Sequence, residues 1–133
     1  MTKHVALGWL LATLLAGGCG GGPEGLGRVP EGPWGGEGIA LDVRASGAVV
    51  ELDCAHGEIT VPLRVEADGS FRLPGYYVHD VGPGLDPEVR KPATYSGLYD
   101  GHRLALSFAL ETGEAAGPFI ATPDAPAHVQ RCR

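Results

Sequence analysis

The hydrophobic residues of this chain recur at every second position from Ile39 onward, and this period constrains the fold more than any other feature. Successive side chains of a β-strand point to opposite faces, so a period of two indicates strands with one buried and one solvated face. The alternation is clear over residues 50–54 and again over residues 104–110. No stretch of ten residues has the 3.6-residue period of an amphipathic helix. The chain is therefore expected to be all-β.

Dipeptides that end in glycine separate the hydrophobic runs, and glycine adopts the positive φ that tight hairpins require. The expected turns lie at Ser46-Gly47, His56-Gly57, Asp68-Gly69, Asp100-Gly101 and Thr112-Gly113. These turns delimit eight expected strands, over residues 38–44, 47–54, 58–66, 70–80, 93–100, 102–111, 114–122 and 127–132. The connection over residues 79–92 is too long for a tight hairpin and is expected to form a loop at the rim.

Eight short strands joined by hairpins form an antiparallel meander, which closes best into a small up-and-down β-barrel. Closure removes the exposed strand edges through which proteins aggregate. A two-sheet β-sandwich is the alternative. Pro62 and Pro74 fall inside expected strands and predict edges or bulges there, because proline has no N–H to donate to a neighbouring strand.

The N-terminal residues have the pattern of a targeting signal. Lys3 and His4 precede an apolar run, Val5–Leu15, which is too short to span a bilayer as a helix. Residues 15–19, LAGGC, then resemble the lipobox of bacterial lipoproteins, with Ala16 at the position where leucine is usual. The resemblance implies a signal peptide over residues 1–18 and lipidation of the Cys19 thiol. An ordinary secretory signal is the alternative.

Residues 17–38 contain 11 Gly and 3 Pro, a composition typical of a flexible linker. Residues 19–37 are therefore expected to form a tether, and residues 38–133 the β-barrel domain. A lipid anchor implies the cell envelope, with the domain in the periplasm or at the surface. Gly20 after the lipobox cysteine implies the outer membrane if the host has one. The net charge of −6 argues against nucleic acid as a partner and against attachment to lipid through basic residues.

Two cysteines remain when Cys19 carries lipid, and an exported compartment permits disulfides. A bond between Cys54 and Cys132 is therefore expected, which would link positions 78 residues apart. The alternative is a metal site that combines these two cysteines with His56, or with both His56 and His79. That site lacks a Cys-x-x-Cys pair and an assigned fourth ligand. No cofactor is expected.

Two sets of motifs resemble known families. A G-x-W motif at residues 32–34, with Arg131 near the C-terminus, resembles lipocalin-like (calycin) barrels. That resemblance implies that Trp34 closes one end of the barrel beneath a basic side chain, in a cation–π contact. Alternatively, Trp34 simply caps the core. WGG at 34–36, LDCAHG at 52–57, DGSF at 68–71 and PGY at 74–76 resemble small exported bacterial proteins of unknown function. This second resemblance implies the fold class and the exported setting, and it carries no activity.

The tyrosines and one histidine supply a candidate ligand or partner surface. Tyr77, Tyr95 and Tyr99 are expected to share one interior wall, with His79 at the mouth of the barrel. Inward-facing glycines near them leave room for a ligand or only for a neighbouring ring. The alternative is a filled core. His79 and Asp80 are adjacent on a strand, so their side chains should point to opposite faces and should not bond each other.

No catalytic residue is assigned, because no serine lies in a nucleophile motif and no carboxylates are paired on the inward face. Three hypotheses for function remain. The first is a membrane-anchored, non-enzymatic module that binds an envelope protein, a glycan or a small apolar ligand. The second, by analogy of fold alone, is an inhibitor of an envelope-attacking enzyme such as a lysozyme or a protease. The third is a metal-binding protein.

Overall fold

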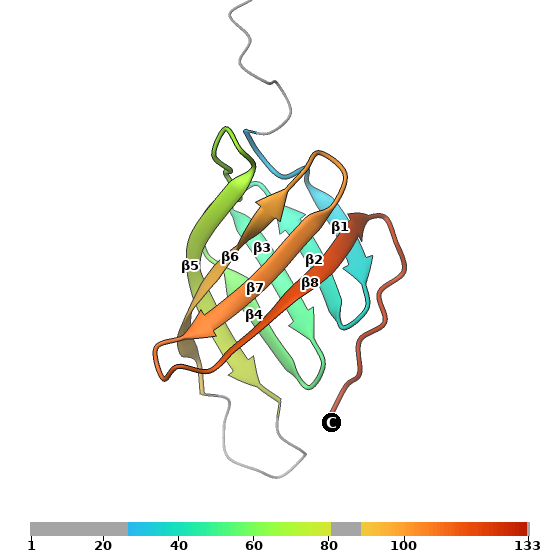
Figure 1. Ribbon diagram of the computed structural model, residues 1–133. Coiled ribbons are helices and arrows are strands. Elements are labelled where there is room, and N and C mark those ends of the chain that lie inside the picture. Colours follow the sequence, from blue (N-terminus) through green and yellow to red (C-terminus); the bar gives the residue numbers. More distant parts are fainter. Residues whose placement is uncertain (1–26, 81–88, 133) are drawn as a thin grey trace, which may run out of the picture.

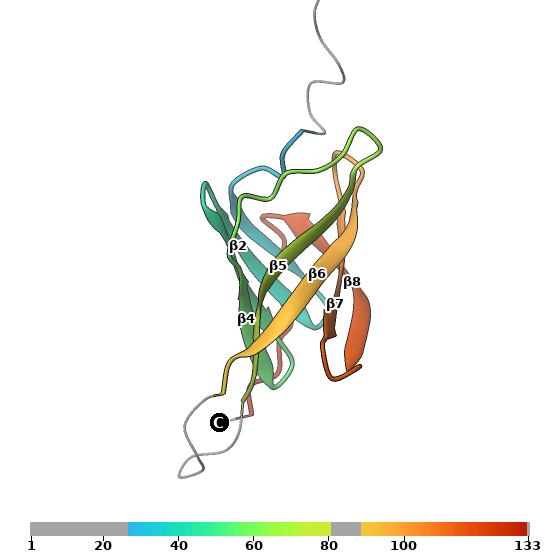
Figure 2. The same cartoon turned by 90° about the vertical axis from the view of Figure 1, so that its left-hand side faces the viewer.

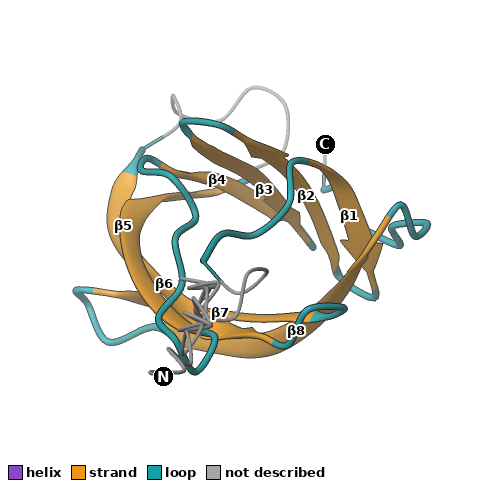
Figure 3. Ribbon diagram, turned by 90° about the horizontal axis from the view of Figure 1, so that it is seen from above, coloured by secondary structure: helices purple, strands orange, loops and turns teal. Residues whose placement is uncertain are grey.

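The computed structural model describes residues 27–80 and 89–132, which form a closed antiparallel barrel of eight strands (Figure 1). The strands are β1 (Gly32–Gly36), β2 (Ile39–Arg44), β3 (Gly47–Leu52), β4 (Ala55–Ile59), β5 (Ser70–His79), β6 (Lys91–Tyr99), β7 (Leu104–Leu110) and β8 (Ala115–Pro123). Each strand pairs with its neighbours in sequence, and β8 pairs with β1 to close the ring seen in Figure 3. The all-β, up-and-down barrel predicted from the hydrophobic period is confirmed.

Several sequence predictions, including the signal peptide over residues 1–18, concern residues that lie outside the described part of the chain. The lipidation site, Cys19, and the first half of the predicted tether precede residue 27. Residues 81–88 of the predicted rim loop are likewise not described. The residues that are described include no helix of the length and apolarity needed to cross a membrane.

The first strand of the barrel lies inside the range predicted as tether, so the predicted domain boundary at residue 38 is wrong. β1 pairs with β2 along its whole length, from Gly32 opposite Val43 to Gly36 opposite Ile39. The hydrophobic pattern does not reveal β1, because Trp34 is the one large side chain in its sequence, GPWGG. Gly35 is required by a close approach: a Cβ there would lie 2.9 Å from the backbone nitrogen of Ala127.

The turn expected at His56-Gly57 lies instead at Asp53-Cys54, where Cys54 has a φ of 54°. β4 therefore occupies Ala55–Ile59 and not residues 58–66. Gly57 lies in the middle of β4, where a Cβ would collide with the Tyr95 hydroxyl. A turn and a close approach both select glycine, so the dipeptide alone does not distinguish them. The other four expected glycine turns all join consecutive strands, as predicted.

Pro74 limits strand pairing, as its lack of an N–H predicts. The Thr60 N–H donates to the Pro74 carbonyl at 3.2 Å, but Pro74 has no N–H with which to return the bond. The β4–β5 ladder accordingly ends at the preceding pair, Ile59 opposite Gly75. Pro62 lies outside the strands, in the connection between β4 and β5.

The predicted tyrosine wall exists, but its side chains form the core and not a ligand surface. Tyr95 has no exposed area, and Tyr77 and Tyr99 are buried. Tyr77 stacks on Phe108 with the ring centroids 4.8 Å apart, and Tyr99 meets Trp34 edge-on at 6.0 Å. The inward glycines admit these rings: Cβ atoms would meet Tyr95 at Gly57 and Gly75, and Phe71 at Gly97. Glycine therefore makes room for neighbouring rings.

The two ends of the barrel are built differently. The upper end in Figures 1 and 2 carries residues 27–31 and the connection between β4 and β5. There the Val29 N–H donates to the Leu63 carbonyl at 3.0 Å, and both side chains are buried. Trp34 donates its indole N–H to the Pro30 carbonyl at 3.0 Å. Trp34 therefore contributes to closing the upper end, which agrees with its expected role as a cap.

The lower end is secured by residues 124–132, which we call the C-terminal strap. The strap follows β8 and runs outside β1 to the lower end (Figure 1). It is not the expected strand over residues 127–132, since it makes a single parallel bridge, between His128 and Glu37. The His128 N–H donates to the Gly36 carbonyl at 3.0 Å, and the Gly38 N–H donates to the His128 carbonyl at 2.8 Å. The strap thereby covers the outer side of β1 below its pairing with β8.

The strap ends in the predicted disulfide. Cys54 and Cys132 are bonded across 78 positions, with their Cα atoms 4.8 Å apart. Two hydrogen bonds support this junction: the Cys54 N–H donates to the Gln130 carbonyl at 2.9 Å, and the Gln130 N–H donates to the Asp53 carboxylate at 2.7 Å. The chain end is therefore fixed to the β3–β4 turn.

Candidate functional site

The sequence-predicted surface residues do not come together at one site. Tyr77, Tyr95 and Tyr99 are buried in the core, while His79 is exposed at the end of β5. The predicted contact of Arg131 with Trp34 is also wrong. Arg131 lies on the strap, with its guanidinium 3.7 Å from the Glu51 carboxylate on the outer wall. Trp34 is buried inside the barrel, so the barrel wall separates the two side chains.

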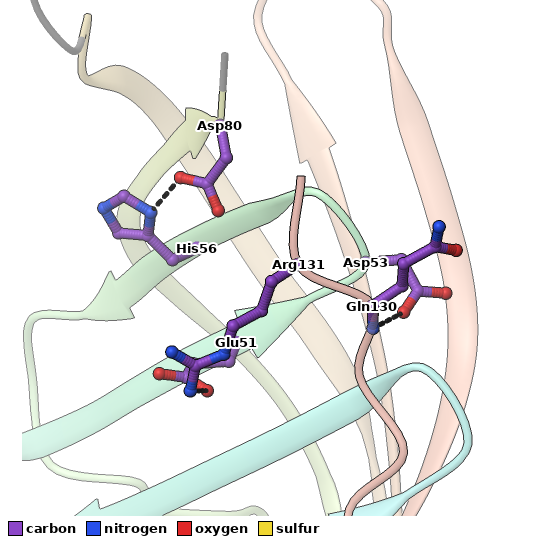
Figure 4. Close-up of polar contacts among 6 residues, drawn as sticks. All are labelled: Glu51, Asp53, His56, Asp80, Gln130 and Arg131. Carbon is purple, nitrogen blue, oxygen red and sulfur yellow. Dashed lines mark hydrogen bonds and ion pairs between the residues drawn. The ribbon is translucent and has the colours of Figure 1, made fainter. Parts of the chain in front are cut away.

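A histidine and a carboxylate meet at the lower end instead. His56 lies on the outward phase of β4, and Asp80 follows the last residue of β5. The Asp80 N–H donates to the Cys54 carbonyl at 2.8 Å, which holds Asp80 beside β4. The His56 Nδ1 then lies 2.7 Å from the Asp80 carboxylate, as Figure 4 shows. Both side chains are partly buried, with 28% of His56 and 14% of Asp80 exposed.

The His56–Asp80 pair borders a small cleft on the outside of the barrel. The cleft has a volume of about 160 Å³. Glu51 and Arg131 stand on its other side, in the arrangement drawn in Figure 4. The remaining lining residues are Val49, Leu52, Ala55 and Val129. The side chains of Leu52 and Ala55 are buried in the core, so Val49 and Val129 supply the apolar surface that the cleft exposes. The cleft therefore combines an apolar floor with an imidazole, a carboxylate and an ion pair at its margin.

The disulfide holds the strap at one side of the cleft, and it leaves no cysteine thiolate there to bind a metal. Val129 and Arg131 belong to the strap, and the bond from Cys132 to Cys54 anchors that strap beside β3 and β4. Because both sulfurs are bonded to each other, Cys54 and Cys132 offer no thiolates, and the metal site that combined them with His56 is excluded. No group of three or more metal-ligating side chains occurs among the residues described.

The His56–Asp80 pair has the geometry that orients an imidazole. The contact between His56 Nδ1 and the Asp80 carboxylate fixes the plane and direction of the imidazole ring. A catalytic base of this kind acts on a nucleophile within hydrogen-bond reach. The eight residues that line the cleft include no serine, threonine or free cysteine. A nucleophile for such a base would therefore have to come from outside these eight residues.

A second hollow is larger, but it is a weaker candidate. It has a volume of about 520 Å³ and lies over the outer side of β5, β6 and β7. Its lining includes Arg72 and Glu111 but otherwise consists of apolar and hydroxyl side chains. Binding sites with specific chemistry bring several polar groups to one point. The smaller cleft brings a hydrogen-bonded pair and an ion pair together among its lining residues.

Two tyrosines of the core have altered acidity. Burial raises the pKa of the Tyr77 phenol, and the charges of Glu114 and Asp80 raise it further. Burial is likewise the main cause that raises the pKa of Tyr95, whose hydroxyl donates to the Tyr76 carbonyl at 2.8 Å. Both phenols are therefore neutral at physiological pH, and they serve the core and not the chemistry of the cleft.

Sequence reasoning misses the His56–Asp80 pair because it assigns His56 to a turn. With β4 beginning at Ala55, His56 faces outward opposite Val78, and Asp80 follows two residues later. The LDCAHG segment contains a usable signal. If one strand ran through residues 52–57, then Leu52, Cys54 and His56 would all lie on the same face of it. A left-handed cysteine at the turn shifts that phase, and no pattern of hydrophobicity shows it.

Comparison with protein-family models, with curated proteins and with solved structures found no match to this chain.

Proposed function

We propose that this chain is a lipid-anchored binding module of the cell envelope, and that the cleft beside His56 recognises a partner protein. The observation that carries the proposal is the junction of the His56–Asp80 pair, the Glu51–Arg131 pair and the disulfide around one apolar floor. The lipobox-like residues ending at Cys19 support the anchor. The proposed module has no catalytic residue.

The size of the cleft favours a macromolecular partner. Pockets that enclose a free small molecule usually measure about 300–1,000 Å³. A cleft of about 160 Å³ is smaller than that range and accommodates one side chain of a larger partner. Protein interfaces concentrate their energy in such places, where one anchoring side chain fills a desolvated pocket.

The chemistry of the cleft suggests which side chain enters it. Val49 and Val129 provide an apolar surface, and the carboxylates of Glu51 and Asp80 provide acceptors. An aromatic side chain with a hydroxyl or N–H donor satisfies both, since one part of it is apolar and the other is polar. We therefore expect a tyrosine or tryptophan of the partner to occupy the cleft. The Glu51–Arg131 pair at the margin is exposed and would orient the partner rather than supply most of the affinity.

Affinity capture from envelope extract tests the proposal when variants are matched. Arg131→Glu reverses the charge at the cleft margin, while Arg44→Glu reverses a similar charge on the same outer wall. Arg44 pairs with Asp42 at 2.9 Å, and its side chain is 63% exposed against 66% for Arg131. We expect Arg131→Glu and His56→Ala to abolish capture of a discrete protein, with Arg44→Glu retaining it.

Two results would contradict this proposal. One is a wild-type chain that captures no protein above the level of bead controls. The other is capture that both arginine variants reduce equally, which would assign the effect to the charge of the wall and not to the cleft. Circular dichroism of each variant keeps the comparison to folded barrels.

A further inference from the structure

The outer wall of the barrel is divided into a charged half and an uncharged half. The outward positions of β2 to β5 include the charged residues Asp42, Arg44, Glu51, Glu58 and Arg72. The outward positions of β6 to β8 are Pro92, Thr94, Ser96, Leu98, Ala105, Ser107, Ala109, Ala115, Ile120 and Thr122. All ten are described by the structure, and none of them is charged. A surface of this kind on an acidic protein calls for an explanation.

The most apolar part of this face is a row across three strands. Leu98 on β6 pairs with Ala105 on β7, and Ala105 pairs with Ile120 on β8. Leu98 is 55% exposed and Ile120 is 47% exposed, which makes them two of the three large hydrophobic side chains exposed in the described chain. Residues paired directly across strands are neighbours on one face of the sheet. We call Leu98, Ala105 and Ile120 the apolar row.

The apolar row lies near the end of the barrel from which the N-terminal segment leaves. Leu98 is next to the last residue of β6, and Ala105 is next to the first residue of β7, both at the upper end. Residues 27–31 occupy the same end, where the Val65 N–H donates to the Gly27 carbonyl at 3.3 Å (Figure 1). The N-terminal segment and the row are therefore at one end of the molecule, and the cleft beside His56 is at the other.

The length of chain before residue 27 limits how far the barrel can lie from an anchored Cys19. Eight peptide units separate Cys19 from Gly27. A fully extended chain gains at most about 3.6 Å per residue, so this segment spans about 29 Å or less. That distance is similar to the length of one strand of the barrel. Given the lipid anchor proposed above, the upper end stays close to the bilayer surface.

We propose that the apolar row rests on the membrane that holds the anchor. This inference rests on the proposed lipid anchor. The anchor raises the effective concentration of bilayer at the apolar row. A contact between the row and lipid therefore forms even if it is too weak to form without the anchor. The outward positions of β6 to β8 carry no charge, and the nearest charged side chains, Asp100 and Arg103, lie in the β6–β7 turn where they can stay at the level of the headgroups. The outward positions of β2 to β5 would instead bury several charged side chains. This orientation points the cleft beside His56 away from the bilayer, where a partner can reach it.

Quenching by brominated acyl chains tests the contact. The lipidated full chain is reconstituted in phosphatidylcholine vesicles whose acyl chains carry bromine, with tryptophan introduced by Leu98→Trp or, as the matched control, by Val89→Trp. Val89 is 65% exposed and precedes β6 at the lower end. After subtraction of the wild-type signal, we expect the Leu98→Trp emission to be quenched at least about threefold more than that of Val89→Trp.

Flotation of the same samples separates the two proposals. Wild type that floats with the vesicles, with Cys19→Ser remaining in the soluble fraction, supports the anchor. Flotation of wild type with equal quenching of the two tryptophans would overturn the membrane contact and leave the anchor standing. Failure of wild type to float would overturn the anchor itself. Absence of quenching together with a concentration-dependent dimer in detergent would assign the row to a second copy of the chain and would also overturn the membrane contact.

Discussion

Tyr95 shows at the residue scale how one side chain organises the interior. Its ring occupies the space left by two glycines, and its hydroxyl donates to the Tyr76 carbonyl at 2.8 Å. A buried phenol needs such an acceptor, because an unpaired hydroxyl in the core costs free energy. The position therefore selects tyrosine together with glycine at 57 and 75.

Tyr95→Phe is expected to lower the free energy of unfolding by about 1 kcal/mol at pH 7, since the hydrogen bond to Tyr76 is lost. In alkali this difference in the free energy of unfolding shrinks and then changes sign. Burial raises the pKa of Tyr95 in the folded state, so the unfolded chain loses its proton first as the pH rises above 10. Ionisation of Tyr95 in the unfolded chain thereby lowers the free energy of unfolding of wild type by about 1.4 kcal/mol per pH unit in that range. The variant has no phenol at this position and does not lose this contribution.

Urea unfolding at pH 7, 9 and 11 measures both effects. The stability difference between wild type and Tyr95→Phe should shrink between pH 9 and pH 11. A difference that stays constant over this range would show that Tyr95 is not protected from ionisation by the folded barrel.

Among the elements, the C-terminal strap is the one whose position depends most on bonds to other parts of the chain. It replaces an expected strand, and its position depends on the disulfide and on hydrogen bonds to β1 and to the β3–β4 turn. Replacing Cys54 and Cys132 together by serine is expected to lower the free energy of unfolding by up to about 4–5 kcal/mol, the entropy of closing a loop of this length. The same variant should lose binding at the cleft, because the strap supplies Val129 and Arg131.

Urea unfolding with and without reductant checks this prediction. Wild type in reductant should approach the stability of the double serine variant, and the variant should not respond to reductant. A wild-type chain whose mass does not change by two protons on reduction would contradict the bond.

The elements that the sequence predicts well are those with alternating side chains of similar size. β2, β3, β5 and β7 have such runs, and their positions follow from the period of two. β1 has one large side chain among glycines and a proline, because the strap lies against its outer face at Gly35. Hydrophobic period therefore cannot find β1. The strap has the opposite character: it alternates like a strand but bonds along its length mainly to turns and strand ends.

For the whole molecule, the sequence predicts the closed barrel and the disulfide but not the site. The barrel follows from patterns local to each strand. The cleft depends on which residues become neighbours across β3, β4, β5 and the strap, and a shift of one residue at the Asp53-Cys54 turn changes that set. His56 and Asp80 are 24 residues apart in sequence, and only the register of β4 against β5 brings them to 2.7 Å.

The two ends of the barrel differ in what they carry. The upper end carries the N-terminal segment and the apolar row, and the lower end carries the disulfide, the strap and the cleft. An anchored module needs this separation, because a partner must reach its binding surface without competing with the bilayer. The central claim is that the cleft beside His56 is that surface.

Site-specific photo-crosslinking in intact cells tests this claim most directly. A photoreactive side chain at Val129 lies in the cleft, and one at Ala109 lies on the uncharged wall of β7 as a control. The account predicts one discrete protein adduct from position 129 that disappears when Arg131→Glu is added, with no protein adduct from position 109. The same adducts from both positions, or none from position 129, would contradict it.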